Sequence, residues 1–80
     1  DQHTLFVSGD TIIGSNNFLA PKVAIAGFVT IGDNCNIGIN STIIDNINIT
    51  DNVQTGGGAV VLNSIIKSGL YVGNPARFLK

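Results

Sequence analysis

Few side chains in this sequence are suited to acid–base or nucleophilic chemistry, and each also has a plain structural interpretation. His3 is the only histidine, and an imidazole is well suited to removing a proton near neutral pH. It could equally be a solvated side chain near the start of the chain. Cys35 is the only cysteine, which excludes an intramolecular disulfide framework. Its place in the repeat described below predicts a core residue.

Three consecutive glycines, Gly56 to Gly58, are the other feature that could serve a ligand. One interpretation is a tight turn, because glycine adopts backbone conformations that other residues avoid. The other is a bare stretch of backbone that a flat ligand can approach closely. The residues by themselves leave both interpretations open.

A period of six residues organises nearly the whole chain and must position these groups. It is clearest from Ile25 to Ser41, where every sixth residue is an isoleucine. Nine of the eleven first positions are Ile, Leu or Val, types that make up only 24 of the 80 residues. The first positions are Asp1, Val7, Ile13, Leu19, Ile25, Ile31, Ile37, Ile43, Ile49, Thr55 and Val61.

The spacing predicts a coil of very short parallel strands. Fifth positions are small or apolar except at Asn17, and the second to fourth positions carry turn-forming Gly, Asp, Asn and Ser. Each unit then gives one short strand, with its fifth and first positions inward and its sixth outward, and one corner. With three units per turn, residues 18 apart stack. The predicted fold is an all-β parallel β-helix of about three and a half coils.

The composition predicts one domain: residues 1–66 form coils, and residues 67–80 form a closing strand and tail. A charged Asp1 at an inward position, with no cap before it, suggests a fragment of a longer protein. The net charge of −1 argues against a nucleic-acid surface, and the apolar runs are too short to span a membrane. We expect a cytoplasmic protein with no metal site.

The outward sixth positions change character along the chain. Phe6, Ile12 and Phe18 are large and apolar, whereas the later ones are mostly polar: Thr30, Asn36, Thr42, Asn48 and Gln54. Large apolar groups on the outside of a β-helix indicate a partner surface. We therefore expect exposed apolar surface concentrated at the N-terminal end and packed on a neighbouring subunit or on a missing part.

The hexapeptides, the turn Gly56 to Ala59 and the closing run Val72 to Arg77 (VGNPAR) resemble the hexapeptide-repeat acyltransferases. The run from Phe18 to Ile43 is similar to the bacterial sugar O- and N-acetyltransferases of the sialic-acid and bacillosamine type. This resemblance implies a left-handed β-helix, a homotrimer and acetyl-CoA as the acyl donor. The acceptor it implies is a hydroxyl or amino group of a sugar or nucleotide sugar.

The resemblance also places the catalytic base. In that branch a histidine and an acidic residue occupy the third and fourth positions of the unit that corresponds here to Val7–Ile12. Those positions are Gly9 and Asp10, so the acid is kept and the histidine is replaced. A second family histidine falls at Phe18 or Lys22, and His3 is left as the candidate base. The alternative is a catalytically silent trimeric β-helix that retains the fold and CoA binding.

The cofactor site follows from the same resemblance. The backbone N–H of Gly27, which is 18 residues after Gly9, corresponds to a donor to the thioester carbonyl. Ile39 and Gly57 share a corner column with His3 and Pro21, and this column lines the pantetheine groove in the family. The remaining expected contacts are Asn74, Pro75 and Ala76 beside the cofactor, and Arg77 with Lys80 facing its phosphates.

Overall fold

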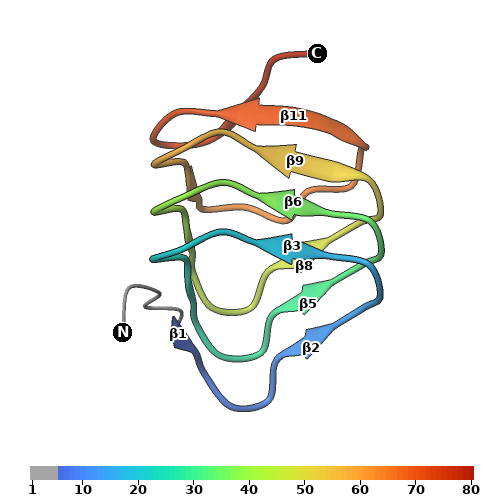
Figure 1. Ribbon diagram of the computed structural model, residues 1–80, viewed down its shortest axis with the longest axis vertical. Helices are drawn as coiled ribbons and strands as arrows, with labels where there is room; N and C mark the ends of the chain where they lie inside the picture. The colour runs from blue at the N-terminus through green and yellow to red at the C-terminus, as the bar shows by residue number, and fades with distance from the viewer. Residues whose placement is uncertain (1–5) are drawn as a thin grey trace.

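The computed structural model describes residues 6–80, and its regular structure there consists of short strands joined by turns (Figure 1). No helix occurs within this range, so none is present there that could cross a membrane. The strands are β1 (Phe6–Val7), β2 (Ile12–Ile13), β3 (Phe18–Leu19), β4 (Ala24–Ile25), β5 (Thr30–Ile31), β6 (Asn36–Ile37), β7 (Thr42–Ile43), β8 (Asn48–Ile49), β9 (Val53–Thr55), β10 (Val60–Val61), β11 (Gly69–Val72) and β12 (Arg77–Phe78).

The strands stack into three sheets that form the faces of a prism. Sheet A has the order β1-β4-β7-β10, sheet B has β2-β5-β8, and sheet C has β12-β11-β9-β6-β3. The parallel partners Ile13 and Ile31, and then Ile31 and Ile49, lie 18 residues apart in sequence, which confirms the predicted coil. In Figure 1 the chain crosses the front from right to left through β3, β6 and β9 while it rises, so the coil is left-handed.

Burial follows the predicted alternation. Ile25, Ile31, Ile37 and Ile43 at first positions have at most 1% of their surface exposed, whereas the neighbouring sixth positions face outward. Burying each such side chain contributes about 1.5–3 kcal/mol, so these isoleucine columns are the main source of stability. Cys35 is buried among them, as expected.

Polar residues at inward positions have specific partners. Asn17 donates from Nδ2 to the Gly32 carbonyl (2.9 Å), and its Oδ1 accepts the Cys35 N–H (2.7 Å). Thr55 Oγ1 accepts the Gly38 N–H at 3.0 Å and lies 3.2 Å from the Ser41 hydroxyl. Among the described residues no buried side-chain nitrogen or oxygen lacks a partner, so these exceptions to the repeat are compatible with the core.

Each corner turns through the same backbone conformation. All nine fourth positions from residue 10 to residue 58 have φ between 58° and 69°, the left-handed region. Asn, Asp and Gly tolerate this region, and they occupy seven of the nine positions. Lys22 and Phe28 are the exceptions.

Three corner columns result, and we name them by the sheets they join. The AB corner contains residues 8–10, 26–28 and 44–46. The BC corner contains residues 14–16, 32–34 and 50–52. The CA corner contains residues 20–22, 38–40 and 56–58.

The last coil is shorter, and a hairpin closes it. Tyr71 of β11 pairs with Thr55, 16 residues earlier, and also with Phe78 of the antiparallel strand β12. The Tyr71 and Phe78 rings meet edge to face at 5.5 Å, and the Lys67 ammonium lies 4.1 Å from the centre of the Phe78 ring. The hairpin of β11 and β12 therefore ends the stack.

Exposed apolar residues occur at the N-terminal end as expected, including Val7 and Phe28, but they are not concentrated there. Ile12 and Phe18 are exposed as predicted, and they lie on two different faces, sheets B and C. The exposure of Phe6 lies outside what the structure describes. Large exposed apolar residues also occur near the C-terminal end, namely Leu62, Ile66, Phe78 and Leu79. Because each coil has three faces, successive sixth positions point in three different directions.

Candidate active site

The AB corner brings together Gly9, Asp10 and Gly27, three of the residues predicted from the sequence. Gly9 and Asp10 are exposed in the first coil, and Gly27 lies directly above Gly9. A Cβ on Gly27 would lie 3.5 Å from Ser8 Oγ and 3.6 Å from the Gly9 carbonyl oxygen. The histidine position of the resemblance is therefore adjacent to the backbone donor position.

Hydrogen bonds hold the backbone around Gly27 in place. The Ala26 carbonyl accepts the Thr11 hydroxyl at 3.0 Å, and the Gly27 carbonyl accepts the Asn46 N–H at 3.1 Å. Within residues 6–80 the Gly27 N–H itself has no acceptor. The equivalent N–H groups of Ser15 and Asp33 at the BC corner are occupied by the Asp33 and Asp51 carboxylates. Gly27 thus offers a fixed, unoccupied donor of the kind that stabilises an oxyanion.

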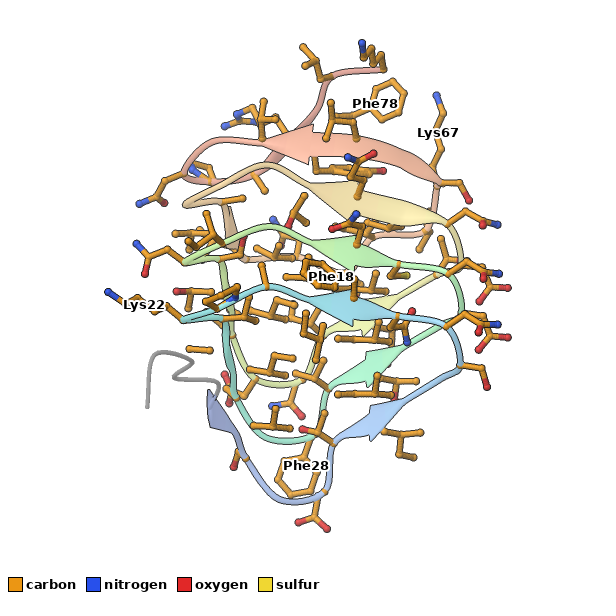
Figure 2. All side chains as sticks on the ribbon, viewed as in Figure 1. Phe18, Lys22, Phe28, Lys67 and Phe78 are labelled. Atoms are coloured by element: carbon orange, nitrogen blue, oxygen red, sulfur yellow. The ribbon has the colours of Figure 1, made fainter. Side chains whose placement is uncertain are left out.

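Phe28 is a part of this corner that the sequence analysis missed. Its side chain is 63% exposed, and its backbone has φ 60°. Figure 2 shows the ring at the end of the molecule that carries the first coil. The signal is present in the sequence, because the other fourth positions from residue 10 to residue 58 carry Asn, Asp, Gly or Lys.

A groove of about 280 Å³ lies on sheet A next to this corner. Strands β4 and β7 line it together with Ala26, Ile44 and Asp45. Ala24 and Thr42, the outward residues of these strands, have small side chains that leave the sheet open. Since the groove reaches Ala26, it ends beside the peptide that carries the Gly27 N–H.

The second group of predicted residues lies at the CA corner. Ile39 and Gly57 stack there, since a Cβ on Gly57 would lie 3.3 Å from Ile39 Cγ2. The turn with Asn74, Pro75 and Ala76 sits above them, held by bonds from Val60 N–H to the Gly73 carbonyl (3.0 Å) and from Ala76 N–H to the Val60 carbonyl (2.7 Å). Ile39, Gly57 and the closing turn therefore lie at the same end of sheet A.

The remaining predicted positions are separate. Arg77 pairs with Val72 in the closing hairpin and is exposed. Phe18 is on sheet C, and Lys22 projects from the CA corner away from the prism (Figure 2). His3 lies outside the described residues. The AB and CA corners are at opposite ends of the strands of sheet A, so one chain does not bring the two groups of site residues into contact.

Cys35 does not belong to either group. Its thiol is buried, and its Sγ lies 3.2 Å from the Thr50 carbonyl. Burial raises the pKa of the Cys35 thiol, with a smaller contribution in the same direction from the Asp51 carboxylate. A protonated, enclosed thiol is a poor nucleophile, so Cys35 is a core residue.

Comparisons with known proteins agree with this fold. The family model described as bacterial transferase hexapeptide (six repeats) matches residues 10–43. A search of curated protein sequences finds no significant match. Among solved structures, a histidine-to-asparagine variant of perosamine N-acetyltransferase from Caulobacter crescentus, in complex with CoA and GDP-perosamine, is 28% identical. It matches with a TM-score of 0.94 over 98% of this chain and 37% of that one.

Two further structures share the fold at lower identity. The acetyltransferase domain of PglB from Neisseria gonorrhoeae is 19% identical, with a TM-score of 0.63 over 94% of this chain and 54% of that one. A maltose O-acetyltransferase from Clostridium difficile is 24% identical, with a TM-score of 0.63 over 96% and 66%. This chain spans less than two thirds of each of these solved chains. The hexapeptide model matches residues 10–43 and the fold is shared along nearly the whole length of the chain, so the chain is similar to the hexapeptide-repeat acyltransferases and has their left-handed β-helix.

Proposed function

We propose that this protein is an acetyl-CoA-dependent acetyltransferase that acts on a sugar or nucleotide sugar. One observation carries the proposal: the similarity along 98% of the chain, at 28% identity, to an N-acetyltransferase solved with CoA and GDP-perosamine. The fixed Gly27 N–H beside the groove supports it, because acetyl transfer creates negative charge on the thioester oxygen.

The reaction needs few groups from the protein. The acceptor's nucleophile attacks the thioester carbonyl carbon, and the carbonyl oxygen becomes an oxyanion that the Gly27 N–H stabilises. Collapse breaks the carbon–sulfur bond and releases CoA as its thiol, while the nucleophile loses one proton. The acetyl group then forms an amide or an ester with the acceptor.

Gly9 at the position of the family histidine favours an amine over a hydroxyl as the acceptor. A neutral amine attacks without losing its proton first, and the positively charged nitrogen of the intermediate then releases a proton readily to water or to a carboxylate such as that of Asp10. A hydroxyl must be deprotonated as it attacks, and this step gains about a hundred- to ten-thousand-fold from a general base. Gly9 supplies none.

We propose a homotrimer with CoA bound between subunits. The AB and CA corners of one chain lie at opposite ends of sheet A, so a threefold arrangement could place the AB corner of one subunit beside the CA corner of the next. Ile39, Gly57 and the turn with Asn74, Pro75 and Ala76 would then line the pantetheine groove. Arg77 would face the phosphates of the cofactor.

Release of free thiol from acetyl-CoA in the presence of matched amino and hydroxy nucleotide sugars tests the proposal. We expect thiol release that depends on the acceptor and is faster with the amino sugar. Calorimetry with CoA is the companion measurement, and a protein that binds no CoA would contradict the assignment.

The second candidate is a catalytically silent β-helix that keeps the CoA groove, and the glycine at position 9 favours it. It predicts CoA binding without acetyl transfer to either kind of acceptor. The same two measurements separate the candidates.

A further inference from the structure

Phe28 occupies a backbone conformation that its side chain disfavours. Six of the nine fourth-position residues between positions 10 and 58 are Asn or Asp and one is Gly, whereas Phe28 has φ 60° with a bulky ring. Every corner of the fold uses this conformation, but a bulky aromatic residue in it is strained, and strain of this kind occurs at ligand sites where the surroundings maintain it. Packing does not explain the residue either, because 63% of its surface is exposed.

The neighbours of Phe28 are polar and acidic. Eighteen residues below it in the corner column is Asp10, and eighteen above it is Asn46. The Asn46 amide donates to the Asp45 carboxylate at 3.3 Å, and Asp45 also lines the groove on sheet A. The preceding peptide presents the unoccupied Gly27 N–H. The AB corner thus carries an exposed aromatic ring, two carboxylates, an amide and a backbone donor.

The charges at the AB corner favour the sugar end of a nucleotide sugar over its phosphate end. Of the cations in residues 6–80, Lys22 belongs to the CA corner, Lys67 lies on the Phe78 ring, and Arg77 and Lys80 belong to the closing hairpin. Asp10 and Asp45 would repel phosphate, whereas carboxylates and amides are good partners for sugar hydroxyls and for an ammonium group. The apolar C–H face of a pyranose matches an aromatic face.

We infer that Phe28 is a specificity-determining residue, whose ring is the platform on which the pyranose of the acceptor packs beside the Gly27 N–H. The inference rests on the proposed acetyl transfer to a sugar. The Asp10 and Asp45 carboxylates then bind the polar rim of the sugar. Sugars whose ring face is apolar, such as deoxy sugars, are the best acceptors, because a ring face with an axial hydroxyl would bury that hydroxyl against the aromatic ring without a partner.

Kinetics of Phe28→Asn with a nucleotide amino sugar tests the inference. Asparagine suits the left-handed conformation, so the variant should fold and melt at the same or a higher temperature than the parent. We expect the KM for the acceptor to rise about tenfold, which corresponds to the loss of one aromatic contact, while the KM for acetyl-CoA stays unchanged. Phe28→Trp should keep the acceptor KM close to that of the parent.

Two controls separate the ring from other effects. Lys22→Asn relieves the same backbone conformation at the CA corner and should raise the melting temperature in the same way. Ile66→Asn removes an apolar side chain that is 89% exposed outside the AB corner and should leave the acceptor KM unchanged. An acceptor KM for Phe28→Asn equal to that of the parent would overturn the inference, although the acetyltransferase assignment would stand.

Proton NMR gives a readout that does not need turnover. When the CoA-loaded protein is titrated with a UDP- or GDP-linked deoxy amino sugar, the ring protons of the sugar should shift upfield with the parent and not with Phe28→Asn. Sugar shifts that are the same for both proteins would contradict the platform. Failure of the parent to bind CoA by calorimetry would instead contradict the proposed function on which the platform rests.

Discussion

At the scale of the residue, position 9 decides whether the AB corner carries a general base. Gly9 is exposed, its φ is not in the left-handed region, and a Cβ there would meet no atom within 4 Å. A larger side chain therefore fits without strain and projects beside Gly27. The corner is ready to hold an imidazole that the sequence does not provide.

Gly9→His should raise acetyl transfer by about a hundred- to ten-thousand-fold, because a general base then lies next to the oxyanion donor and Asp10 is already in place. The gain should be larger for hydroxyl acceptors than for amines, and the rate should increase with pH as the imidazole loses its proton. Thiol release from acetyl-CoA measures it, with Gly9→Asn as the control without a base.

His3→Ala addresses the one histidine of the chain. If the unmodified protein is active and His3→Ala abolishes that activity, His3 is the base and the proposed preference for amines has no basis. If His3→Ala keeps the activity of the parent, the result supports the proposed preference for amine acceptors.

Cys35 should give the fold a dependence on alkaline pH. The pKa of its thiol is higher in the folded than in the unfolded chain, because burial disfavours the thiolate. Its contribution to stability is then complete below the pKa of the unfolded thiol and is lost as pH rises through the raised pKa of the folded thiol. Urea unfolding from neutral to alkaline pH measures this loss, and Cys35→Ala should show a smaller decline. Identical declines would show that other groups cause it.

At the scale of the element, the corners require glycine for reasons of space as well as of conformation. A Cβ on Gly38 would lie 2.6 Å from the Thr55 carbonyl oxygen and 2.8 Å from the Gly56 carbonyl carbon, both backbone atoms of the coil above. On Gly14 and Gly32, a Cβ would collide with the Asp33 and Asp51 carboxylates that accept corner N–H groups. Second-position glycines thus let neighbouring coils approach each other.

Gly38→Ala should lower the free energy of unfolding by about 1–3 kcal/mol, since the coil above cannot move away without losing its parallel hydrogen bonds. For a domain of this size that is a fall in Tm of about 4–8 °C for each kcal/mol. Gly9→Ala, where space is open, is the matched control and should melt close to the parent. Equal melting temperatures for the two variants would show that the coil above can move away from the added Cβ without loss of stability.

At the scale of the whole molecule, the proposed site is complete only in an assembly. The AB and CA corners are separated by the width of sheet A. In the proposed trimer, each subunit would therefore contribute one half of a cleft on each side. We expect light scattering to give three times the mass of one chain, with CoA binding that weakens on dilution below the assembly range. A stable monomer at micromolar concentration that binds CoA with full affinity would contradict a site between subunits.

The sequence alone determined the β-helix, its 18-residue coil and nearly all of its core, because first and fifth positions must be inward wherever a strand and a corner alternate every six residues. The 18-residue spacing also placed Gly27 above Gly9 and Gly57 above Ile39, whereas the position of Asn74 to Ala76 beside the cofactor came from the family resemblance and stays a prediction. The cytoplasmic location and the fragment boundary stay predictions.

Only the tertiary structure decided what depends on contacts between coils. Asn17 and Thr55 are polar residues at inward positions where the repeat favours apolar ones. They fit the core because backbone groups of adjacent coils form hydrogen bonds with their side chains. The outward apolar residues are dispersed, because the three faces of the prism separate neighbours in sequence. The proposed role of Phe28 depends on its left-handed backbone, its exposure and the free N–H of Gly27 beside it. The hexapeptide period predicts which way a strand residue points, but it does not predict the surroundings of a corner residue.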